Sequence, residues 1–470
     1  MRNFSILTLG CKVNQYESQQ IRELLERFGL YQADITSSPD LVVINTCCVT
    51  HTASAKSRHL LHQAQRRDPQ DIVVCGCLPA GQIEELTATA ENLHVVRDQC
   101  DLASTLSLLI NAQLTTPDLE SPTQSGDPFI RAEEEPKVKR KNDLCPPSEL
   151  PPLARFEGHT RAFLKIQDGC DAFCTYCIIP RTRPRVHSKA PDKVLSEAAD
   201  LVAAGHREIV VTGIHIGAYG QPTVRRRHWA QPENPHLPEI LRRLAQVPGL
   251  HRIRLSSLDP ADVTPALLDA IAEHCNIMPH LHLSLQSGSD NILHGMARPY
   301  TAAEFTAKVE MIRSRLDRPA ITTDIIVGFP SETDADFRQT LDLAREIGFA
   351  KIHVFPFSPR AGTAAARMPG KVASEVVKER SLALRELDQR LQRQFRGQFL
   401  GQTAQVLIEA TGDRPAGRTE RYFMAYLNEA SGADNNDIVS VKIEKNTRDG
   451  VLVAVIIGKR HRGDLQAFPA

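Results

Sequence analysis

The stretch Asp168-Gly169-Cys170-Asp171-Ala172-Phe173-Cys174-Thr175-Tyr176-Cys177 places three thiols within eight positions. It directly follows the apolar run 162–166, which we interpret as a buried strand. The thiols are therefore expected on the loop at the end of that strand. Packing alone does not require three cysteines at this spacing, so we interpret Cys170, Cys174 and Cys177 as ligands of one metal centre.

The number of thiols indicates which metal centre this loop would hold. Three thiolates on a tight loop bind an iron-sulfur cubane and leave one iron open to an outside ligand, such as a substrate or cofactor. A structural zinc ion normally takes four protein ligands, so the zinc alternative needs a fourth residue, for which His187 is the candidate. We favour the cubane, because zinc sites usually show their fourth ligand at readable spacing.

The middle of the chain alternates strand patterns with amphipathic helix patterns, which predicts a partial α/β barrel of about six units. Catalytic groups are expected at the carboxyl ends of the strands of such a barrel. Glycines at these ends let backbone approach a cofactor, and Gln286 or Asp324 is placed to bond a ribose or an amino group. The six predicted strands are 162–166, 208–212, 252–256, 280–285, 321–327 and 351–355.

Three more cysteines, Cys11, Cys47 and Cys77, each follow an apolar run near the N-terminus. With helix patterns at 18–28 and 53–66 between them, these runs predict a parallel α/β sheet, and Thr52 is the candidate cap of the second helix. The carboxyl ends of parallel strands share one edge, so the three thiols should converge there and hold a second cluster. The alternative is three separate buried strand-end cysteines.

Two neighbouring cysteines compete for the same role. Cys48 adjoins Cys47, and Cys75 shares a strand face with Cys77 by the two-residue period of a strand. The pattern of residues alone does not choose within either pair.

The rest of the chain predicts a linker and a small third domain. Residues 112–155 are rich in Pro, Ser, Glu and Lys, and we interpret the charge run at 137–141 as a solvated part of this linker rather than an RNA clamp. After a helix at 374–395, alternating patterns at 403–409, 421–427, 438–444 and 451–457 predict a small antiparallel β-barrel. Such barrels commonly bind oligonucleotides.

Composition limits the cellular setting and the partners. The formal net charge of the 470 residues is zero, so a polyanion would have to meet a local basic patch. No run near 18 apolar residues occurs, so neither a membrane partner nor a membrane span is expected, and we expect a cytoplasmic protein whose eleven cysteines are ligands or buried thiols. The candidate RNA-binding residues are Arg225, Arg226 and Arg227 in a loop of the barrel, and Arg418, Arg421 and Tyr422 in the last domain.

Several motifs together resemble the radical S-adenosylmethionine methylthiotransferases over nearly the whole chain. The motifs are Gly10-Cys11-Lys12-Val13-Asn14-Gln15-Tyr16-Glu17-Ser18, Asn45-Thr46-Cys47-Cys48-Val49-Thr50, Gly76-Cys77-Leu78-Pro79, the triad Cys170, Cys174 and Cys177 with Ile178-Ile179-Pro180, and Leu285-Gln286-Ser287-Gly288-Ser289. The first two resemble the branch that acts on threonylcarbamoyladenosine next to the tRNA anticodon. The loop 219–237 and the linker are longer than is usual in the family.

The resemblance implies a domain order and a set of cofactors. It implies an auxiliary-cluster domain at 1–111, a linker at 112–155, a radical S-adenosylmethionine domain at 156–396 and a TRAM domain at 397–463. It selects Cys47 and Cys77 over Cys48 and Cys75, which gives two 4Fe-4S clusters, on Cys11, Cys47 and Cys77 and on Cys170, Cys174 and Cys177. The S-adenosylmethionine contacts expected from it are Tyr176, Gly213, Ser284, Gln286 and Asp324.

The same resemblance implies the reaction and its partners. A 5′-deoxyadenosyl radical made from S-adenosylmethionine would take the hydrogen from C2 of the adenine, the auxiliary cluster would handle the sulfur, and a second S-adenosylmethionine would supply the methyl group. The partners implied are the tRNA anticodon loop and an electron donor such as flavodoxin or ferredoxin. The alternatives are methylthiolation of isopentenyladenosine in tRNA, methylthiolation of a ribosomal-protein side chain, and a non-enzymatic zinc-stabilised RNA-binding protein.

Overall fold

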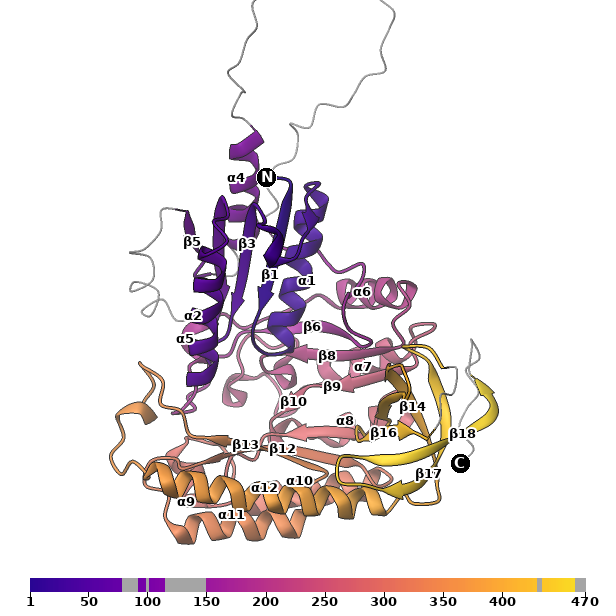
Figure 1. The fold of residues 1–470 in the computed structure, drawn as a ribbon. Coiled ribbons are helices and arrows are strands. Elements are labelled where there is room, and N and C mark those ends of the chain that lie inside the picture. The colour runs from indigo at the N-terminus through magenta and orange to yellow at the C-terminus, as the bar shows by residue number, and fades with distance from the viewer. Residues whose placement is uncertain (78–91, 99–100, 115–148, 429–432, 461–470) are drawn as a thin grey trace, which may run out of the picture.

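A computed structural model of the chain describes residues 1–77, 92–98, 101–114, 149–428 and 433–460. Figure 1 shows a sheet domain (indigo) standing on a central α/β barrel, with a small β-barrel (yellow) at the side. Residues 115–148 of the predicted linker 112–155, the charge run at 137–141 within it, and the stretch Leu78-Pro79 lie outside the described residues.

The N-terminal domain is a parallel sheet in the order β2-β1-β3-β4-β5. Its central strand β3 is buried along its whole length, as expected for a parallel sheet covered on both faces. The strands are β1 (Asn3–Thr8), β2 (Tyr31–Gln32), β3 (Leu41–Thr46), β4 (Asp71–Gly76) and β5 (Leu93–Val95), and the helices are α1 (Lys12–Arg27), α2 (His51–Gln65) and α4 (Leu102–Leu114).

Two predicted helix starts in this domain were wrong. The first helix begins at Lys12 and not at residue 18, because Cys11 already adopts the extended backbone of an N-cap. The cap of α2 is Thr50 and not Thr52, since the Thr50 hydroxyl accepts a hydrogen bond from the backbone N–H of Ala53 at 3.1 Å. Both helices therefore start closer to the cysteine-bearing strand ends than predicted.

The central domain is the predicted partial barrel, built from two four-stranded sheets in the orders β7-β6-β8-β9 and β10-β11-β12-β13. All six predicted strands are present within a few residues. The strands are β6 (Ala162–Asp168), β7 (His187–Ser188), β8 (Glu208–Gly213), β9 (Arg252–Leu255), β10 (Ser257–Leu258), β11 (His280–Leu283), β12 (Ala320–Val327) and β13 (Lys351–Pro356). Neighbouring barrel strands are parallel, apart from the short β7.

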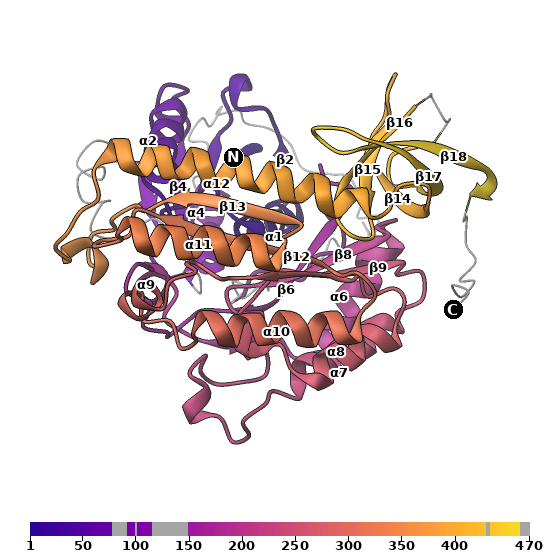
Figure 2. The ribbon, with the colours of Figure 1, turned by 90° about the horizontal axis from the view of Figure 1, so that it is seen from below.

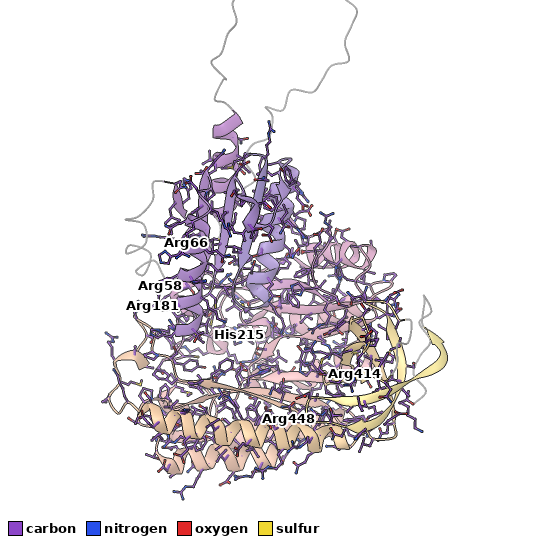
Figure 3. All side chains as sticks on the ribbon, in the orientation of Figure 1. Arg58, Arg66, Arg181, His215, Arg414 and Arg448 are labelled. Carbon is purple, nitrogen blue, oxygen red and sulfur yellow. The ribbon has the colours of Figure 1, made fainter. Side chains whose placement is uncertain are left out.

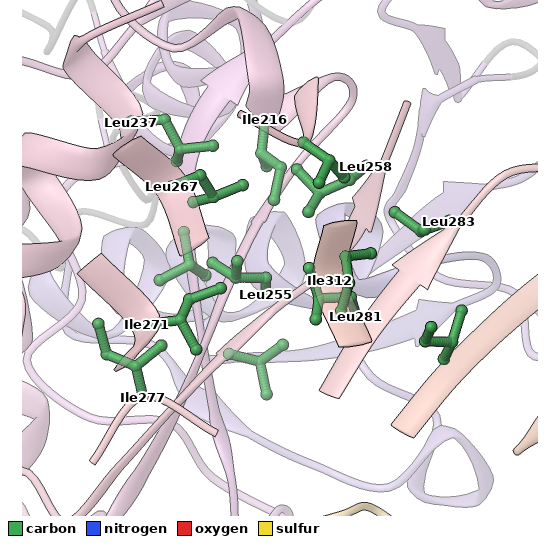
Figure 4. Packing of buried hydrophobic residues seen from close by; sticks show 14 of the residues in the cluster. Ile216, Leu237, Leu255, Leu258, Leu267, Ile271, Ile277, Leu281, Leu283 and Ile312 are labelled. Carbon is green, nitrogen blue, oxygen red and sulfur yellow. The ribbon is translucent and has the colours of Figure 1, made fainter. Parts of the chain in front are cut away.

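Helices cover the outside of this barrel, and a single apolar cluster fills the space between helices and strands. Figure 4 shows part of that cluster, with Leu255, Leu281 and Leu283 of the strands packed against Ile271 and Ile312 of the helices. The view from below in Figure 2 shows α10, α11 and α12 running alongside β12 and β13. The helices are α5 (Ile179–Thr182), α6 (Pro191–Ala203), α7 (His236–Ala245), α8 (Pro265–Glu273), α9 (Asp290–Gly295), α10 (Ala302–Arg315), α11 (Asp334–Ile347) and α12 (Ser374–Gly397).

The last domain is a closed five-stranded barrel in the order β14-β15-β16-β18-β17. Its β16–β18 pair is parallel, whereas the other pairs are antiparallel as predicted. The strands are β14 (Thr403–Ala410), β15 (Ala416–Thr419), β16 (Met424–Leu427), β17 (Ile438–Asn446) and β18 (Val451–Arg460). The sequence prediction missed β15 and began β16 three residues early, because the backbone turns between them at Tyr422 with a φ of 71°.

Both outer domains are joined to the barrel by buried side chains. Tyr16 of α1 belongs to the apolar cluster of the barrel, and its hydroxyl donates a 2.6 Å hydrogen bond to Glu197 of α6. On the other side, the buried Arg252 and Arg254 of β9 donate hydrogen bonds to backbone carbonyls of the small barrel, including that of Thr419 at 2.7 Å. Among the residues described, no helix is long and apolar enough to cross a membrane.

Candidate metal centres and substrate pocket

The loop with Cys170, Cys174 and Cys177 follows β6 directly, as predicted. It turns at Gly169, whose φ is 79°, and a Cβ atom there would lie 1.8 Å from the carbonyl oxygen of Arg185, so only glycine fits. The backbone N–H of Cys170 then donates a 2.9 Å hydrogen bond to the carbonyl of Arg183. These interactions fix where the first thiol leaves the strand.

The environment of this triad suits thiols that are deprotonated by metal binding. Burial raises the pKa of Cys170 to about 11 and the pKa of Cys177 to about 12, so neither is a thiolate at neutral pH without a ligand. Arg298 donates a 3.3 Å hydrogen bond to the sulfur of Cys174, and its guanidinium also pairs with Asp259 at 2.5 Å. A cation beside the sulfurs would stabilise the negative charge of a bound cluster.

The structure also brings Cys11, Cys47 and Cys77 together at the carboxyl edge of the first sheet. The backbone N–H of Cys77 donates to the carbonyl of Thr46 at 2.9 Å, which places the ends of β3 and β4 side by side. Burial raises the pKa of Cys47 and also that of Cys77, the latter to about 11, and in both cases the nearby Cys11 adds to the shift. Cys11 is exposed while the other two thiols are buried.

The two competing cysteines occupy different surroundings. Cys75 packs within the apolar core formed with α1 and α4, whereas Cys77 packs with Cys48 and Ile178. Cys48 is fully buried, and its thiol donates a hydrogen bond to the backbone carbonyl of Cys77. We therefore keep Cys47 and Cys77 as the proposed ligands.

The spacing of the thiols tests the zinc alternative. Sulfurs bound to one tetrahedral zinc ion stand about 3.8 Å apart, given Zn–S bonds of about 2.3 Å. Within the described ranges, neither cysteine triad forms a group whose ligand atoms all lie within 4.8 Å of one another, and His187 completes no such group. A single zinc ion would therefore require the ligand atoms of either triad to move closer together, whereas a cubane holds its thiolates farther apart.

A buried charge network joins the two triads. The Nε atom of Arg183 donates to the sulfur of Cys77 at 3.2 Å, and its Nη1 atom donates to Glu17 at 2.7 Å and to Asp168 at 3.0 Å. Lys165 donates to the same two carboxylates at 2.9 and 2.6 Å. Burial by itself would raise the pKa of Glu17 and Asp168, but the adjacent cations outweigh burial and lower it.

The lumen of the barrel below the triads is polar. His282, Asp324 and His353 come from the adjacent strands β11, β12 and β13, and one ligand atom of each lies within 4.8 Å of the others. His282 bonds Asp324 at 3.2 Å and Thr322 at 3.0 Å. Burial lowers the pKa of Lys12, which lies close enough for the carboxylate of Asp324 to oppose that shift.

The predicted S-adenosylmethionine contacts lie around the mouth of the barrel. Gly213 ends β8, Ser284 and Gln286 follow β11, and Asp324 lies within β12. Gln286 has a φ of 68°, and its backbone pairs with β12 through hydrogen bonds of 2.9 Å to Asp324 and Ile326. A left-handed conformation in a residue other than glycine is a strain that functional sites often carry. Tyr176 lies in the cysteine loop, where burial raises its pKa well above the usual value.

The predicted RNA contacts in the barrel loop are engaged within the protein. The Nε atom of Arg225 donates to the carbonyl of Asp171 at 2.7 Å, and its guanidinium stacks on Phe173 at 4.0 Å. Arg226 pairs with Asp262, and only the exposed Arg227 faces solvent without an acidic partner among the described residues. This loop therefore braces the cysteine loop through Asp171.

The predicted RNA contacts in the small barrel lie mainly at its interface with the α/β barrel. Tyr422 stacks on His280 with ring centroids 4.4 Å apart, and Arg418 lies over the Tyr422 ring. Arg421 pairs with Asp317 at 3.1 Å. These three residues join two domains in the structure.

Sequence reasoning gave no role to Arg183, Arg298 or His215, although it placed His215 in a strand-end segment at the mouth of the barrel. Arg183 follows Cys177 by only six positions, so it was visible as a cation beside the triad, whereas Arg298 is distant in sequence and gave no signal. His215 lies near the centre of the molecule (Figure 3), where its backbone N–H donates to Gln167 at 2.7 Å. Burial opposes its protonation, but Asp262 outweighs that effect and raises the pKa of His215.

The barrel carries a three-cysteine loop after its first strand, and a second cysteine triad lies on the neighbouring domain. This arrangement defines the class of radical S-adenosylmethionine enzymes with an auxiliary centre. Comparison with known families agrees: residues 164–344 match the Radical SAM superfamily, and residues 3–97 match the family described as Uncharacterized protein family UPF0004. Among solved structures, the radical S-adenosylmethionine methyltransferase TsrM from Kitasatospora setae shares the fold at a TM-score of 0.52 and 16% identity, over 78% of this chain and 74% of that one.

Characterised relatives extend over nearly the whole chain. The threonylcarbamoyladenosine tRNA methylthiotransferase MtaB of Chlamydia pneumoniae is 33% identical over 96% of this chain and 98% of its own, and that of Thermotoga maritima is 35% identical over 87% of each. A tRNA-2-methylthio-N(6)-dimethylallyladenosine synthase of Pelotomaculum thermopropionicum is 34% identical over 89% of each chain. The chain therefore belongs to the radical S-adenosylmethionine methylthiotransferase family.

Proposed function

We propose that this protein is a tRNA methylthiotransferase that places a methylthio group on C2 of threonylcarbamoyladenosine next to the anticodon. The family relationship supports the reaction, and relatives of both tRNA branches match at similar identity. The choice of substrate therefore rests on this chain's own residues. In this proposal the protein works in the cytoplasm and receives electrons from a small protein such as flavodoxin or ferredoxin.

The observation that carries the choice of substrate is the polar lumen. His282, Asp324 and His353 line it from three adjacent strands, and Lys12 at the start of α1 lies within electrostatic range of Asp324. An isopentenyl group is apolar and offers these groups no hydrogen-bond partner beyond those they already have within the protein. A threonylcarbamoyl group brings a carboxylate, a hydroxyl and a urea, which can pair with an ammonium and with imidazoles. Sites built to hydrogen-bond a substrate reject the analogue that lacks those groups.

The cofactors fit the two cysteine triads. Cys170, Cys174 and Cys177 would hold one 4Fe-4S cluster, and Cys11, Cys47 and Cys77 would hold the other. When bound, these clusters supply the single electron that cleaves S-adenosylmethionine and the site at which sulfur is handled. The residues around them are arranged to hold negative charge, since Arg298 and Arg183 each donate to a thiol sulfur.

The chain's own groups would orient the substrates. The turn at Gln286 fixes backbone at the mouth, where we propose that Gly213, Ser284 and Asp324 contact S-adenosylmethionine, with Tyr176 closing the pocket from the cysteine loop. The target adenosine lies in a loop of the tRNA, so taking it out of its stack costs a few kcal/mol at most.

The test is to supply the reconstituted enzyme with two RNAs that differ only in the modified adenosine. We expect the methylthio product on RNA with threonylcarbamoyladenosine and at least about a hundredfold lower kcat/KM on RNA with isopentenyladenosine, a ratio typical of sites that pair with polar substrate groups. Nucleoside mass spectrometry measures both products. Preferential modification of isopentenyladenosine would overturn the substrate assignment and leave the reaction class in place.

A further inference from the structure

Helix α2 of the first domain presents a row of cations that the proposed reaction does not use. No Asp or Glu occurs between residues 41 and 67, while Lys56, Arg58, Arg66 and Arg67 all fall within the helix or just past its end. Arg58, His62 and Arg66 are spaced by four residues and so share one face of the helix. In a chain with no net charge, this concentration of one sign is local to α2.

These side chains are accessible and unneutralised. Lys56, His59, His62 and Arg66 are exposed, and Arg58 is partly exposed. Within the part of the chain that the structure describes, Lys56, Arg58 and Arg66 form no ion pair. By contrast, the exposed Arg345 of α11 pairs with Asp342.

The row leads to the mouth of the barrel. Figure 3 shows Arg66, Arg58 and Arg181 one below another along the same edge of the molecule. Arg181 is exposed and lies on α5, directly after the loop of Cys177. The segment after β13 connects the two helices, because a Cβ atom at Gly362 would lie within 2.9 Å of the Arg181 guanidinium.

The other end of that segment touches the first turn of α2. Arg360 donates a 3.1 Å hydrogen bond to the hydroxyl of Ser54, and the backbone N–H of His51 donates to Ser358 at 3.0 Å. The cations of α2 and α5 therefore lie along one exposed side of the protein, which we call the α2 track. We define it as Arg58, Arg66 and Arg181, together with Lys56 at the other edge of the exposed side of α2.

We propose that the α2 track binds the phosphate backbone of the tRNA anticodon stem while the target base lies in the barrel. This inference rests on the proposed function, since it takes tRNA as the substrate. Lys56 and Arg66 are ten residues apart, which along a helix is about 15 Å, enough to meet several successive phosphates. The track begins beside the cysteine loop where the base must enter and continues away from it, as a stem must when its loop is held at the mouth.

An acidic electron-donor protein is the other polyanion that such a surface attracts. A donor needs only to approach the cluster, which lies at the Arg181 end, so the cations that extend to Arg66 favour an elongated ligand. Binding and reduction measured on the same variants separate the two partners.

The test compares tRNA affinity and its salt dependence in the full-length, cluster-loaded protein. In K56E/R58E/R66E we expect the Kd for tRNA to rise at least about tenfold near 150 mM salt, and the slope of log Kd against log salt to fall by about two or more, roughly one for each phosphate that is no longer bound. The neutral variant K56Q/R58Q/R66Q should lie between this variant and the wild type.

The control is R27E/K193E/R345E, which changes the net charge equally at exposed residues elsewhere, where side-chain exposures are 54%, 71% and 51%. It should keep the wild-type salt slope. A single-stranded oligonucleotide of the anticodon loop alone should bind the wild type and the α2 variants equally, because it lacks the stem. Iron content and 5′-deoxyadenosine formation with a chemical reductant should be unchanged in every variant, which shows that the fold is intact.

Three outcomes would decide against the inference. Equal Kd and equal salt slope for tRNA in the wild type and K56E/R58E/R66E would overturn it. Unchanged tRNA binding together with slower reduction by flavodoxin would assign the surface to the electron donor instead. An equal loss of tRNA affinity in the control variant would show that the effect comes from net charge alone. If the wild type itself modifies no tRNA, the proposed function fails, and that result is distinct from these three.

Discussion

Arg183 donates a hydrogen bond to the sulfur of Cys77 at 3.2 Å, although the two residues belong to different domains. The same guanidinium pairs with Glu17 of the first domain and with Asp168 at the base of the radical cysteine loop. One side chain thus ties together the two places where clusters are expected. The arrangement is buried, with Arg183 only 8% exposed and Glu17 fully buried.

Replacement of Arg183 by Ala should destabilise the protein and its second centre together. Among the described residues, Lys165 would be the one side-chain cation still hydrogen-bonded to Glu17 and Asp168, and breaking a buried pair costs about 3–5 kcal/mol. We expect a lower melting temperature and loss of part of the iron in R183A, with a smaller loss of both in R183K. Thermal unfolding and iron analysis measure the two effects. A wild-type melting temperature in R183A would show that the network is not stabilising.

The two cysteine triads should be separable by mutation. C170A, C174A and C177A should each abolish the formation of 5′-deoxyadenosine, because no other ligand replaces a thiolate. The triple variant C11A/C47A/C77A should lose about half of the iron, since each site would hold one cubane, and still form 5′-deoxyadenosine without making product. Iron analysis and mass spectrometry of the reaction would show this. Wild-type 5′-deoxyadenosine formation in all three single variants would refute the assignment of the first triad.

Cys48→Ala and Cys75→Ala serve as matched controls for the second triad. Both thiols are buried and lie beside the proposed ligands, so we expect full iron content and activity in each. Loss of iron in C48A, with none in C47A, would mean that the ligand is the other member of that pair. The same comparison applies to C75A and C77A.

Lys12→Met should impair the use of threonylcarbamoyladenosine while the clusters stay in place. Lys12 is partly buried at the start of α1, where the carboxylate of Asp324 favours its charged form, and it directly follows the proposed ligand Cys11. If its ammonium pairs with the substrate carboxylate, loss of that charged hydrogen bond should cost about 1.5–3 kcal/mol, or roughly ten- to a hundredfold in kcat/KM. Iron content should be unchanged. A kcat/KM equal to that of the wild type would show that Lys12 does not bind the substrate.

Glu208 should make the protein sensitive to acid. Burial would raise its pKa, but Arg254, Arg252 and Arg161 outweigh burial and hold the pKa of Glu208 below the usual 4.5. A carboxyl group whose pKa is lower in the folded than in the unfolded protein stabilises the fold at pH values above its unfolded-state pKa. This stabilisation is lost as the pH falls through the folded-state pKa. Below pH 4.5 the wild type should therefore lose stability faster than E208Q. Melting temperatures measured down the pH scale, with exposed Glu149→Gln as control, would test this; parallel curves would contradict it.

Tyr422→Ala should weaken the packing between domains rather than the binding of phosphate. Its ring stacks on His280 and lies under Arg161, Arg254 and Arg418. Removal of an aromatic pair of this kind costs about 0.5–1.5 kcal/mol beyond the buried area. We expect a lower melting temperature with an unchanged salt slope for tRNA binding. A reduced salt slope with an unchanged melting temperature would show that Tyr422 contributes to RNA binding instead.

The barrel and the first sheet could be predicted because the periodicity of apolar residues and the positions of the cysteines can be read from short stretches of sequence. Each barrel strand is a short apolar run, and each cysteine of the first sheet follows such a run, so their meeting at one edge follows from parallel topology. Where the chain turns in the last barrel, the signal failed: Tyr422 adopts a left-handed φ that its residue type does not announce. As a result β15 was missed.

The functional surfaces were harder to predict, because an arginine looks the same in sequence whether it meets phosphate or protein. Arg421 and Arg225 were expected to bind RNA, and both are held by partners within the chain. Arg58 and Arg66 stand in an ordinary amphipathic helix, and only the absence of acidic neighbours among the described residues distinguishes them. Which charges are already neutralised depends on how distant segments pack together.

Tyr16 of α1 is buried in the core of the barrel and bonded to Glu197. Because this tyrosine fixes the first domain on the barrel, the two cysteine triads keep a constant separation. Turnover therefore does not proceed by one domain swinging between two positions. Instead, the RNA must be repositioned or released between steps. The same burial limits engineering. A chimera that takes its first domain from another branch of the family must also carry the matching surfaces of β6 and α6, or it will expose an unfilled hole where the tyrosine was.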